Sequence, residues 1–206
     1  MTKQRITLFD TTLRDGAQTP GIDFSVEDKI AISAMLDDFG LDYIEGGYPG
    51  ANPTDTEFFS QPRTESATFT AFGMTKRAGV SVSNDPGIAA LLASSASAIC
   101  YVAKAWDLHV RVALGCSNED NLEGISTSVT AAREAGKEAL VDCEHFFDGY
   151  KANPDYALAC ARAAYDAGAR WVVLCDTNGG CQPGEIRTIV EAVCAVIPGD
   201  HVGIHA

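Results

Sequence analysis

The sequence predicts an α/β fold, a TIM (β/α)8 barrel truncated at its seventh strand. Short apolar runs typical of buried strands alternate with longer helical patterns along the 206 residues. From Ile6 to Val202 this alternation repeats in steps of about 33 residues, the size of a βαβ unit. Eight such units would need about 260 residues, close to the usual length of a TIM barrel.

The first strand is expected at 6–9, and a helix follows from Ser25 to Phe39. Ser25 can cap this helix and Gly40 can end it. Its apolar stripe consists of Ile30, Met35, Leu36 and Phe39. Such a stripe is typical of a helix that packs one face against a core.

The same alternation places the later elements. Further strands are expected at 43–45, 68–72, 98–102, 139–143, 171–175 and 202–204, and further helices at 55–59, 86–94, 117–136, 153–167 and 185–196. An open doubly wound sheet has a similar order of elements, but it predicts a glycine-rich phosphate loop after the first strand. The segment DTTLRDGAQ at that point has no such loop, which favours the barrel.

A parallel barrel that lacks its closing strand would expose two edges and part of its core. We therefore interpret residues 1–206 as one incomplete catalytic barrel domain, a fragment of a longer chain.

Composition limits the partners and the setting. A formal net charge of -13 argues against nucleic acid and against anionic membranes. The uncharged stretch at 87–103 is short for a membrane span and contains serines, so we interpret it as a helix end, a turn and a buried strand. The seven cysteines have no C-x-x-C spacing, and no targeting segment is visible, so a reducing, cytoplasmic location is expected.

Polar residues recur where the predicted strands end, which is where TIM barrels place their active sites. These residues are Arg14, Asp15, Glu45, Asp142, Glu144, His145, Asp176, Thr177, Asn178 and His205. Asp15 and His205 together could bind a divalent cation of the Mg, Mn or Zn type, although a lone carboxylate near a barrel end is usually a helix cap or an ion-pair partner. Arg14 could stabilise an oxyanion, with Glu45 holding it through charge-assisted hydrogen bonds, or could simply pair with Asp15.

Glu144 and His145 are a plausible pair for proton transfer. Neighbouring residues of a strand point to opposite faces, so only one of the two should face the barrel axis. Thr177 could donate a hydrogen bond to a substrate carboxylate, or could cap the NGG loop that follows it.

Several segments together resemble the citramalate synthases and, more widely, the metallolyase superfamily that contains 2-isopropylmalate and homocitrate synthases and hydroxymethylglutaryl-CoA lyase. These segments are LFDTTLRDGAQTPGIDFSVEDK, DYIEGGYPGANPTDTEFF, KAWDLHV, DCEHFFDGYKANPDYAL and LCDTNGGCQP. The resemblance runs from Ile6 to the last residue. It implies a divalent metal, acetyl-CoA as co-substrate, pyruvate as the 2-oxo acid, and citramalate as a product on the route to isoleucine.

The resemblance also implies a role for each residue that matches the family pattern. Asp15 and His205 would be metal ligands, and Arg14 would bind and polarise the 2-oxo group. Glu45 would orient Arg14, and Glu144 would act in acid–base chemistry on the acetyl methyl group. Thr177 would hold the oxo-acid carboxylate. Gln18 lies in the same motif without an assigned role.

The sequence departs from the family pattern at its end. The second histidine of the family's H-x-H metal pair would follow Ala206, and the linker and C-terminal regulatory domain are not in the sequence. We therefore expect the isolated fragment to be inactive, and the full-length protein to be a homodimer. The rival interpretations are a sibling synthase acting on another 2-oxo acid, a carbon–carbon lyase, and a barrel that only binds a partner.

Overall fold

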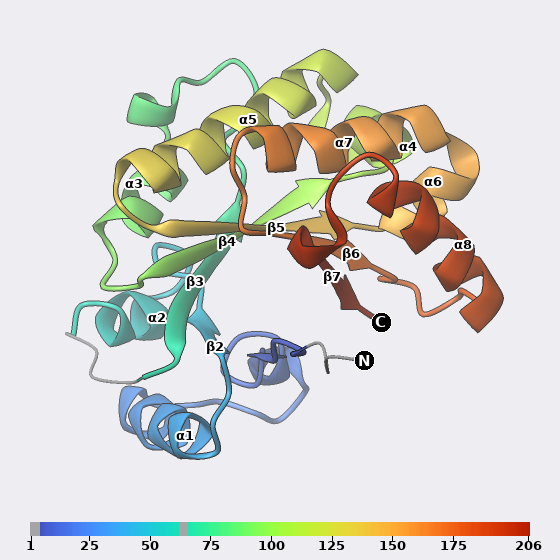
Figure 1. The fold of residues 1–206 in the computed structure, drawn as a ribbon. Helices are drawn as coiled ribbons and strands as arrows, with labels where there is room; N and C mark the ends of the chain where they lie inside the picture. The colour runs from blue at the N-terminus through green and yellow to red at the C-terminus, as the bar shows by residue number, and fades with distance from the viewer. Residues whose placement is uncertain (1–4, 62–65) are drawn as a thin grey trace.

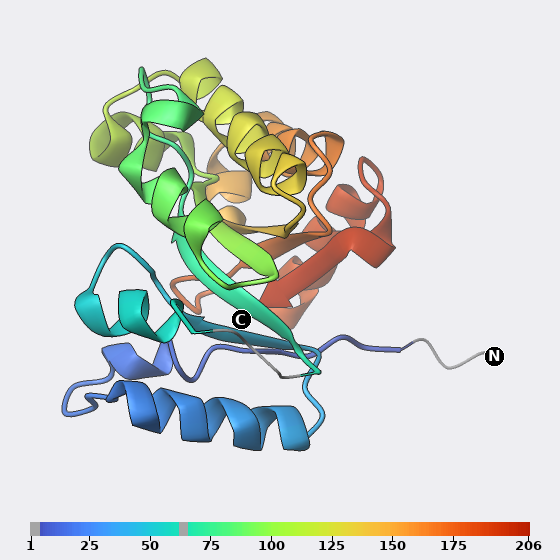
Figure 2. The same cartoon turned by 90° about the vertical axis from the view of Figure 1, so that its left-hand side faces the viewer.

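The computed structural model describes residues 5–61 and 66–206. In these residues one parallel sheet has the strand order β1-β2-β3-β4-β5-β6-β7, so each strand pairs with its neighbours in the sequence. The strands are β1 Phe9–Asp10, β2 Tyr43–Gly47, β3 Thr68–Met74, β4 Ala98–Lys104, β5 Glu138–Glu144, β6 Trp171–Cys175 and β7 Val202–His205. The sheet curls into an open barrel with helices on its outer side (Figures 1 and 2).

The connections between strands are mainly α-helical. The helices are α1 Val26–Asp38, α2 Pro53–Phe58, α3 Pro86–Ala93, α4 Asp107–His109, α5 Asn118–Glu134, α6 Phe146–Ala152, α7 Pro154–Asp166 and α8 Pro183–Cys194. Short 3-10 turns lie at Gly16–Gln18, Val82–Asn84 and Gly199–His201, and a π-helical turn lies at Val110–Leu114. The truncated TIM barrel expected from the sequence is confirmed by this arrangement.

Helix ends follow the local sequence signals. Ser25 caps α1 and Ser117 caps α5, and in each case an aspartate three residues later completes a reciprocal capping box. Asn153 caps α7, as the expected start of that helix indicated. Local hydrogen bonding therefore sets these boundaries without help from the rest of the fold.

Side-chain alternation gives the sheet two different faces. Residues such as Ile99 and Tyr101 of β4 pack beneath the outer helices, whereas Ala98 and Cys100 point to the inner side and form a separate small cluster. Trp171 of β6 donates from its Nε1 to the hydroxyl of Tyr43 of β2, at 3.1 Å. Contact between two strands that are far apart in the sheet order shows how strongly the sheet curls.

Two sequence expectations need correction. The first strand is Phe9–Asp10 rather than 6–9, because pairing with β2 begins at Phe9, and the Ile6 side chain is 78% exposed. The apolar stripe of α1 is not its buried face: Met35 and Phe39 are 71% and 81% exposed, whereas Lys29 is 3% exposed.

The same discrepancy holds for Ile30, which is 44% exposed, while Leu36 is partly buried against the core. The buried face of α1 combines Lys29 and its polar partners with Val26, Ile32 and Leu36, which pack against the core. Neither α6 nor the π-helical turn is expected from the sequence; they extend the loops after β5 and β4.

Candidate active site at the carboxyl ends of the strands

A cavity of about 690 Å³ opens where the parallel strands end. Five of the six residues to which the family resemblance gives a role line it together, namely Arg14, Asp15, Glu144, Thr177 and His205, and so do the strand-end residues Asp142, Asp176 and Asn178. Glu45 lies beneath Arg14 and is 0% exposed. The structure thus brings all six residues to one end of the sheet, as expected for strand-end side chains of a parallel barrel.

Arg14 is held from several directions. Its Nε donates to Oε2 of Glu45 at 2.6 Å, and an Nη donates to Asp15 at 3.1 Å. The guanidinium carbon lies 4.0 Å from the centre of the Phe72 ring. The contact between Arg14 and Glu45 suggested by the sequence is therefore present, and it fixes the guanidinium at the cavity wall.

Glu45 is a buried carboxylate, and one of its two oxygens has no hydrogen-bond partner among the described residues. Burial raises the pKa of Glu45 to about 8, against the opposing effect of Arg14. The unpartnered oxygen is Oε1, which is itself buried. Because an unpaired buried acceptor costs free energy, this carboxyl group is poised to take a proton or to accept a donor from a neighbour.

A second group of ligand-type side chains lies across the cavity. Donor atoms of Asp142, Cys175 and His205 all lie within 4.8 Å of one another. Asp15 lines the same cavity with a side chain that is 46% exposed, and it is bonded to Arg14. Its expected role as a ligand stays a prediction.

Sequence reasoning did not assign Asp142 and Cys175 to this group. Cys175 was interpreted, like the other strand cysteines, as a small apolar residue, and Asp142 only as a strand-end polar group. The alternation of side chains along a strand could have identified both residues. Asp142 shares the inner face of β5 with Glu144, and Cys175 pairs with His205 in the ladder between β6 and β7. Burial raises the pKa of Asp142, and the Cys100 thiol hydrogen bond acts against that shift.

The donor set around His205 suits a divalent ion. Carboxylate oxygen with imidazole nitrogen is typical of Mg, Mn and Zn sites, and a thiolate adds affinity for zinc. Asp142, Cys175 and His205 would hold such an ion, with Asp15 at the same wall of the cavity.

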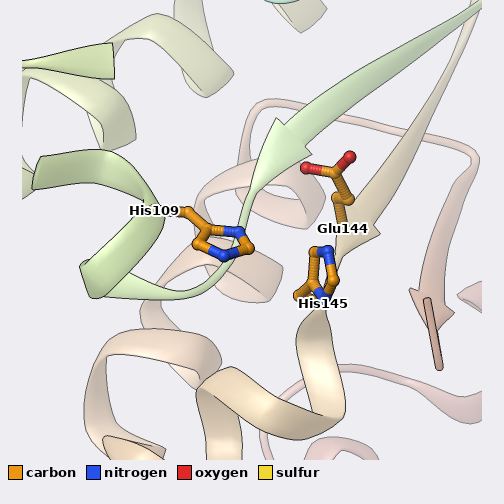
Figure 3. Close-up of side chains that lie close together, drawn as sticks. All are labelled: His109, Glu144 and His145. Atoms are coloured by element: carbon orange, nitrogen blue, oxygen red, sulfur yellow. The ribbon is translucent and has the colours of Figure 1, made fainter. Parts of the chain in front are cut away.

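Glu144 and His145 take different positions, as alternation required. Glu144 ends β5 and lines the cavity, whereas His145 begins the next turn with a left-handed backbone, φ 53°. Figure 3 shows His145 beside His109 of α4 and Glu144. The two imidazoles meet edge to face, with centroids 4.6 Å apart.

Lys104 forms an ion pair with Glu144, next to the two histidines. A cation placed between His109, His145 and Glu144 would meet the ammonium group of Lys104 as a competitor for the same carboxylate. Burial lowers the pKa of His109, and His145 lowers it further, so the His109 ring favours its neutral form. This competition for Glu144 disfavours a metal ion at the two histidines.

Thr177 has a structural contact in addition to its place at the cavity. Its Oγ1 accepts a hydrogen bond from the backbone N–H of His145, at 2.8 Å. This bond leaves the hydroxyl hydrogen free to donate elsewhere. It joins the loop after β6 to the end of β5.

Comparison with known proteins gives a consistent set of relatives. A family model described as HMGL-like matches residues 5–206. An (R)-citramalate synthase of Streptomyces coelicolor is 51% identical over 203 residues, and one of Aquifex aeolicus is 47% identical over 206 residues. A 2-isopropylmalate synthase of a Bradyrhizobium species is 31% identical over 196 residues.

These matches cover 97%, 98% and 95% of this chain, but only 38%, 39% and 36% of those relatives. The chain therefore spans about two-fifths of the length of the curated proteins it matches.

Solved structures support the fold. A Bacillus subtilis HMG-CoA lyase aligns with a TM-score of 0.80 at 20% identity, covering 98% of this chain and 68% of the lyase. A hydroxymethylglutaryl-CoA lyase from Pseudomonas aeruginosa aligns at 0.79 and 26% identity, covering 98% and 67%. Among the described helices, none combines the length and the apolar character that crossing a bilayer requires.

Proposed function

The chain belongs to the HMGL-like family, and from this premise we propose that the intact protein condenses acetyl-CoA with pyruvate to form citramalate. The observation that carries the proposal is that the chain is more similar in sequence to citramalate synthases than to 2-isopropylmalate synthases. Five (R)-citramalate synthases match at 41–51% identity, whereas three 2-isopropylmalate synthases match at 30–34%.

The proposed reaction is a Claisen-type condensation. Glu144 removes a proton from the acetyl methyl group, and the resulting carbanion attacks the oxo carbon of pyruvate, forming the new carbon–carbon bond. The alkoxide so formed takes up one proton, which balances the one that Glu144 removed, and water then cleaves the thioester, releasing free CoA and citramalate. Glu144 lies at the cavity wall, where it forms an ion pair with Lys104.

Arg14 acts on the oxygen that becomes negative. Its guanidinium faces the cavity while Glu45 and Phe72 hold it from behind, so little reorganisation is needed as an alkoxide forms on the former oxo group. Thr177 donates its hydroxyl hydrogen to the carboxylate of pyruvate. Both interactions are made by side chains of the same cavity, which supports binding of one small 2-oxo acid between them.

A divalent metal is part of the proposal. When bound, it polarises the 2-oxo group as a Lewis acid. The candidate ligands are His205 and Asp15 from the family resemblance, and Asp142 and Cys175 from the geometry.

The remaining assignments concern the cellular setting of the intact protein. It acts as a homodimer in the cytoplasm, on a route toward isoleucine, without binding nucleic acid or membranes. The net charge of -13 supports the last point, because it repels phosphate-rich surfaces.

Substrate comparison tests the proposed function. We expect kcat/KM for CoA release by the intact enzyme with Mn(II) to be at least about tenfold higher with pyruvate than with 2-oxoisovalerate, because extra methyl groups change binding by roughly that factor. It should also be higher than with 2-oxoglutarate, which brings a second carboxylate into the pocket. A preference for 2-oxoisovalerate would instead make it a 2-isopropylmalate synthase, the second candidate suggested by the weaker relatives.

His205→Ala should weaken Mn(II) binding at least about tenfold, measured by titration; unchanged affinity would contradict the role of His205 as a ligand.

A further inference from the structure

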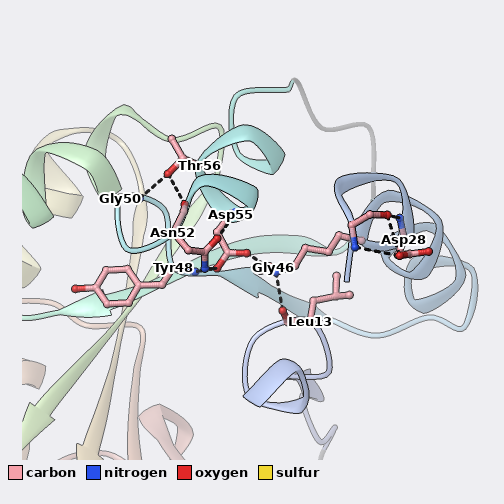
Figure 4. Close-up of polar contacts among 10 residues, drawn as sticks. Leu13, Asp28, Gly46, Tyr48, Gly50, Asn52, Asp55 and Thr56 are labelled. Atoms are coloured by element: carbon pink, nitrogen blue, oxygen red, sulfur yellow. Dashed lines mark hydrogen bonds and ion pairs between the residues drawn. The ribbon is translucent and has the colours of Figure 1, made fainter. Parts of the chain in front are cut away.

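Lys29 is a buried lysine outside the cavity. It lies on α1, is 3% exposed, and is not among the residues that line the cavity. Its ammonium group donates to the backbone oxygen of Leu13 at 2.8 Å and to that of Gly46 at 2.9 Å, and it forms an ion pair with Asp55. We call this set of contacts the Lys29 bridge; Figure 4 shows Leu13, Gly46 and Asp55 converging there.

The two backbone oxygens of the Lys29 bridge belong to the neighbours of the Arg14–Glu45 pair. Leu13 directly precedes Arg14, and Gly46 directly follows Glu45. One ammonium group therefore links the two backbone segments from which this pair projects. A lysine offers three donors, and all three are engaged here.

Asp55 gives the Lys29 bridge a rigid end. Its Oδ2 accepts from the backbone N–H of Tyr48 and from Nδ2 of Asn52, both at 2.8 Å. At Gly47, whose φ is 144°, an added Cβ would lie 2.4 Å from Cγ of Asp55. The Asp55 carboxylate is thus packed directly against the end of β2 and has little room to move.

Burial explains why these contacts constrain the backbone. A charged ammonium group inside a protein is tolerated only when its donors are satisfied, and removal of one partner leaves the others unpaired. Any displacement of the Leu13 or Gly46 backbone would break a hydrogen bond inside the protein interior, where water cannot replace it. The orientation of α1, with Lys29 inward and Ile30 and Met35 outward, is consistent with this requirement.

We propose that the Lys29–Asp55 pair is a positioning device that sets the separation and orientation of Arg14 and Glu45. Lys29 would not touch substrate; it acts through the backbone on either side of the pair. The effect on catalysis rests on the proposed function above, whereas the effect on the Arg14–Glu45 geometry does not.

The chain offers a matched control. Lys137 is also partly buried, and its ammonium group donates to two backbone oxygens, those of Ser94 at 2.8 Å and Ala96 at 2.5 Å. These acceptors lie just before β4, at the end of the sheet away from the cavity. Lys137→Met therefore removes the same kind of contact without reaching Arg14.

The test uses the intact protein with arginine labelled with nitrogen-15, and the Arg14 Nε–H signal is assigned by its loss in Arg14→Lys. In Lys29→Met we expect this signal to shift or broaden and kcat/KM for pyruvate to fall by roughly 100-fold, the effect of about 1 Å of misplacement. Lys137→Met should leave the Arg14 signal and kcat/KM unchanged. Asp55→Asn should change the Arg14 signal as Lys29→Met does, with a smaller loss of activity.

An unchanged Arg14 signal in folded Lys29→Met, or an equal change in Lys137→Met, would overturn the proposal. If Lys29→Met does not fold, the signal in Asp55→Asn decides in the same way. If the protein does not act on pyruvate, the Arg14 signal still reports on the Lys29 bridge, so failure of the proposed function and failure of the positioning role are distinguished.

Discussion

The two sides of the cavity are built differently. On the side formed by β1, β2 and α1, Arg14 is paired with the fully buried Glu45, and the Lys29 bridge holds the backbone beside both. On the side formed by β6 and β7, Thr177 and His205 are exposed. One side is thus constrained by buried charges, and the other presents exposed donor atoms near the cavity opening.

This difference indicates a division of labour. Stabilisation of a developing negative charge needs a donor that does not move during the reaction, which burial and charge-assisted hydrogen bonds provide. Binding of a variable substrate instead needs accessible groups. Substitutions on the Arg14 side should therefore change catalysis most, and the three predictions below concern that side of the cavity.

The largest effect is expected for Arg14→Lys in the intact protein. Lysine lacks the planar fork that bonds Glu45 and stacks on Phe72, so kcat/KM for pyruvate should fall roughly 100- to 1000-fold, measured as CoA release. Arg170→Lys is the matched control, because Arg170 lies 3.9 Å over the Trp171 ring and is not among the residues lining the cavity. A loss of less than about tenfold in Arg14→Lys would show that the constrained side does not dominate catalysis.

A smaller effect concerns stability and pH. Because the folded-state pKa of Glu45 is raised to about 8, its neutral form favours folding, and this contribution is lost as the pH rises through 8. The free energy of unfolding, relative to Glu45→Gln, should therefore fall by on the order of 3 kcal/mol between pH 5 and pH 9. Urea unfolding of the unsubstituted protein and of Glu45→Gln, both in EDTA, measures this difference. If the free energies of unfolding of the two proteins depend on pH in the same way, the raised pKa of Glu45 is contradicted.

The smallest effect is expected for the cap of α1. Ser25→Ala should lower the free energy of unfolding by about 1 kcal/mol, because it removes the capping bond to the N–H of Asp28. Ser117→Ala, which removes the equivalent bond in α5, should cost about the same. Since α1 carries Lys29, only Ser25→Ala should also lower kcat/KM, by less than about threefold. Equal activity of the two variants would show that fraying of α1 does not reach Arg14.

Much of the fold was predictable because its signals are local. The caps Ser25 and Ser117 and the strand at Trp171–Cys175 are found as expected. The helix α6 was missed because it follows β5 after a single left-handed residue, His145, with no separate start signal in the sequence.

The candidate site was predictable only in part. Strand-end positions identified Arg14, Glu45 and His205 as residues that would meet at one end of the sheet. Cys175 and Lys29 were not singled out, since a cysteine in a strand and a lysine in an amphipathic helix are ordinary in sequence.

The sequence by itself determined the order of strands and helices, the strand faces and the helix caps, because these depend on residues within a few positions of one another. The tertiary structure alone decided which face of α1 is buried and which acceptors surround Lys29. Those contacts join residues 16 to 26 positions apart, and their energy depends on exclusion of water by the folded sheet and helices.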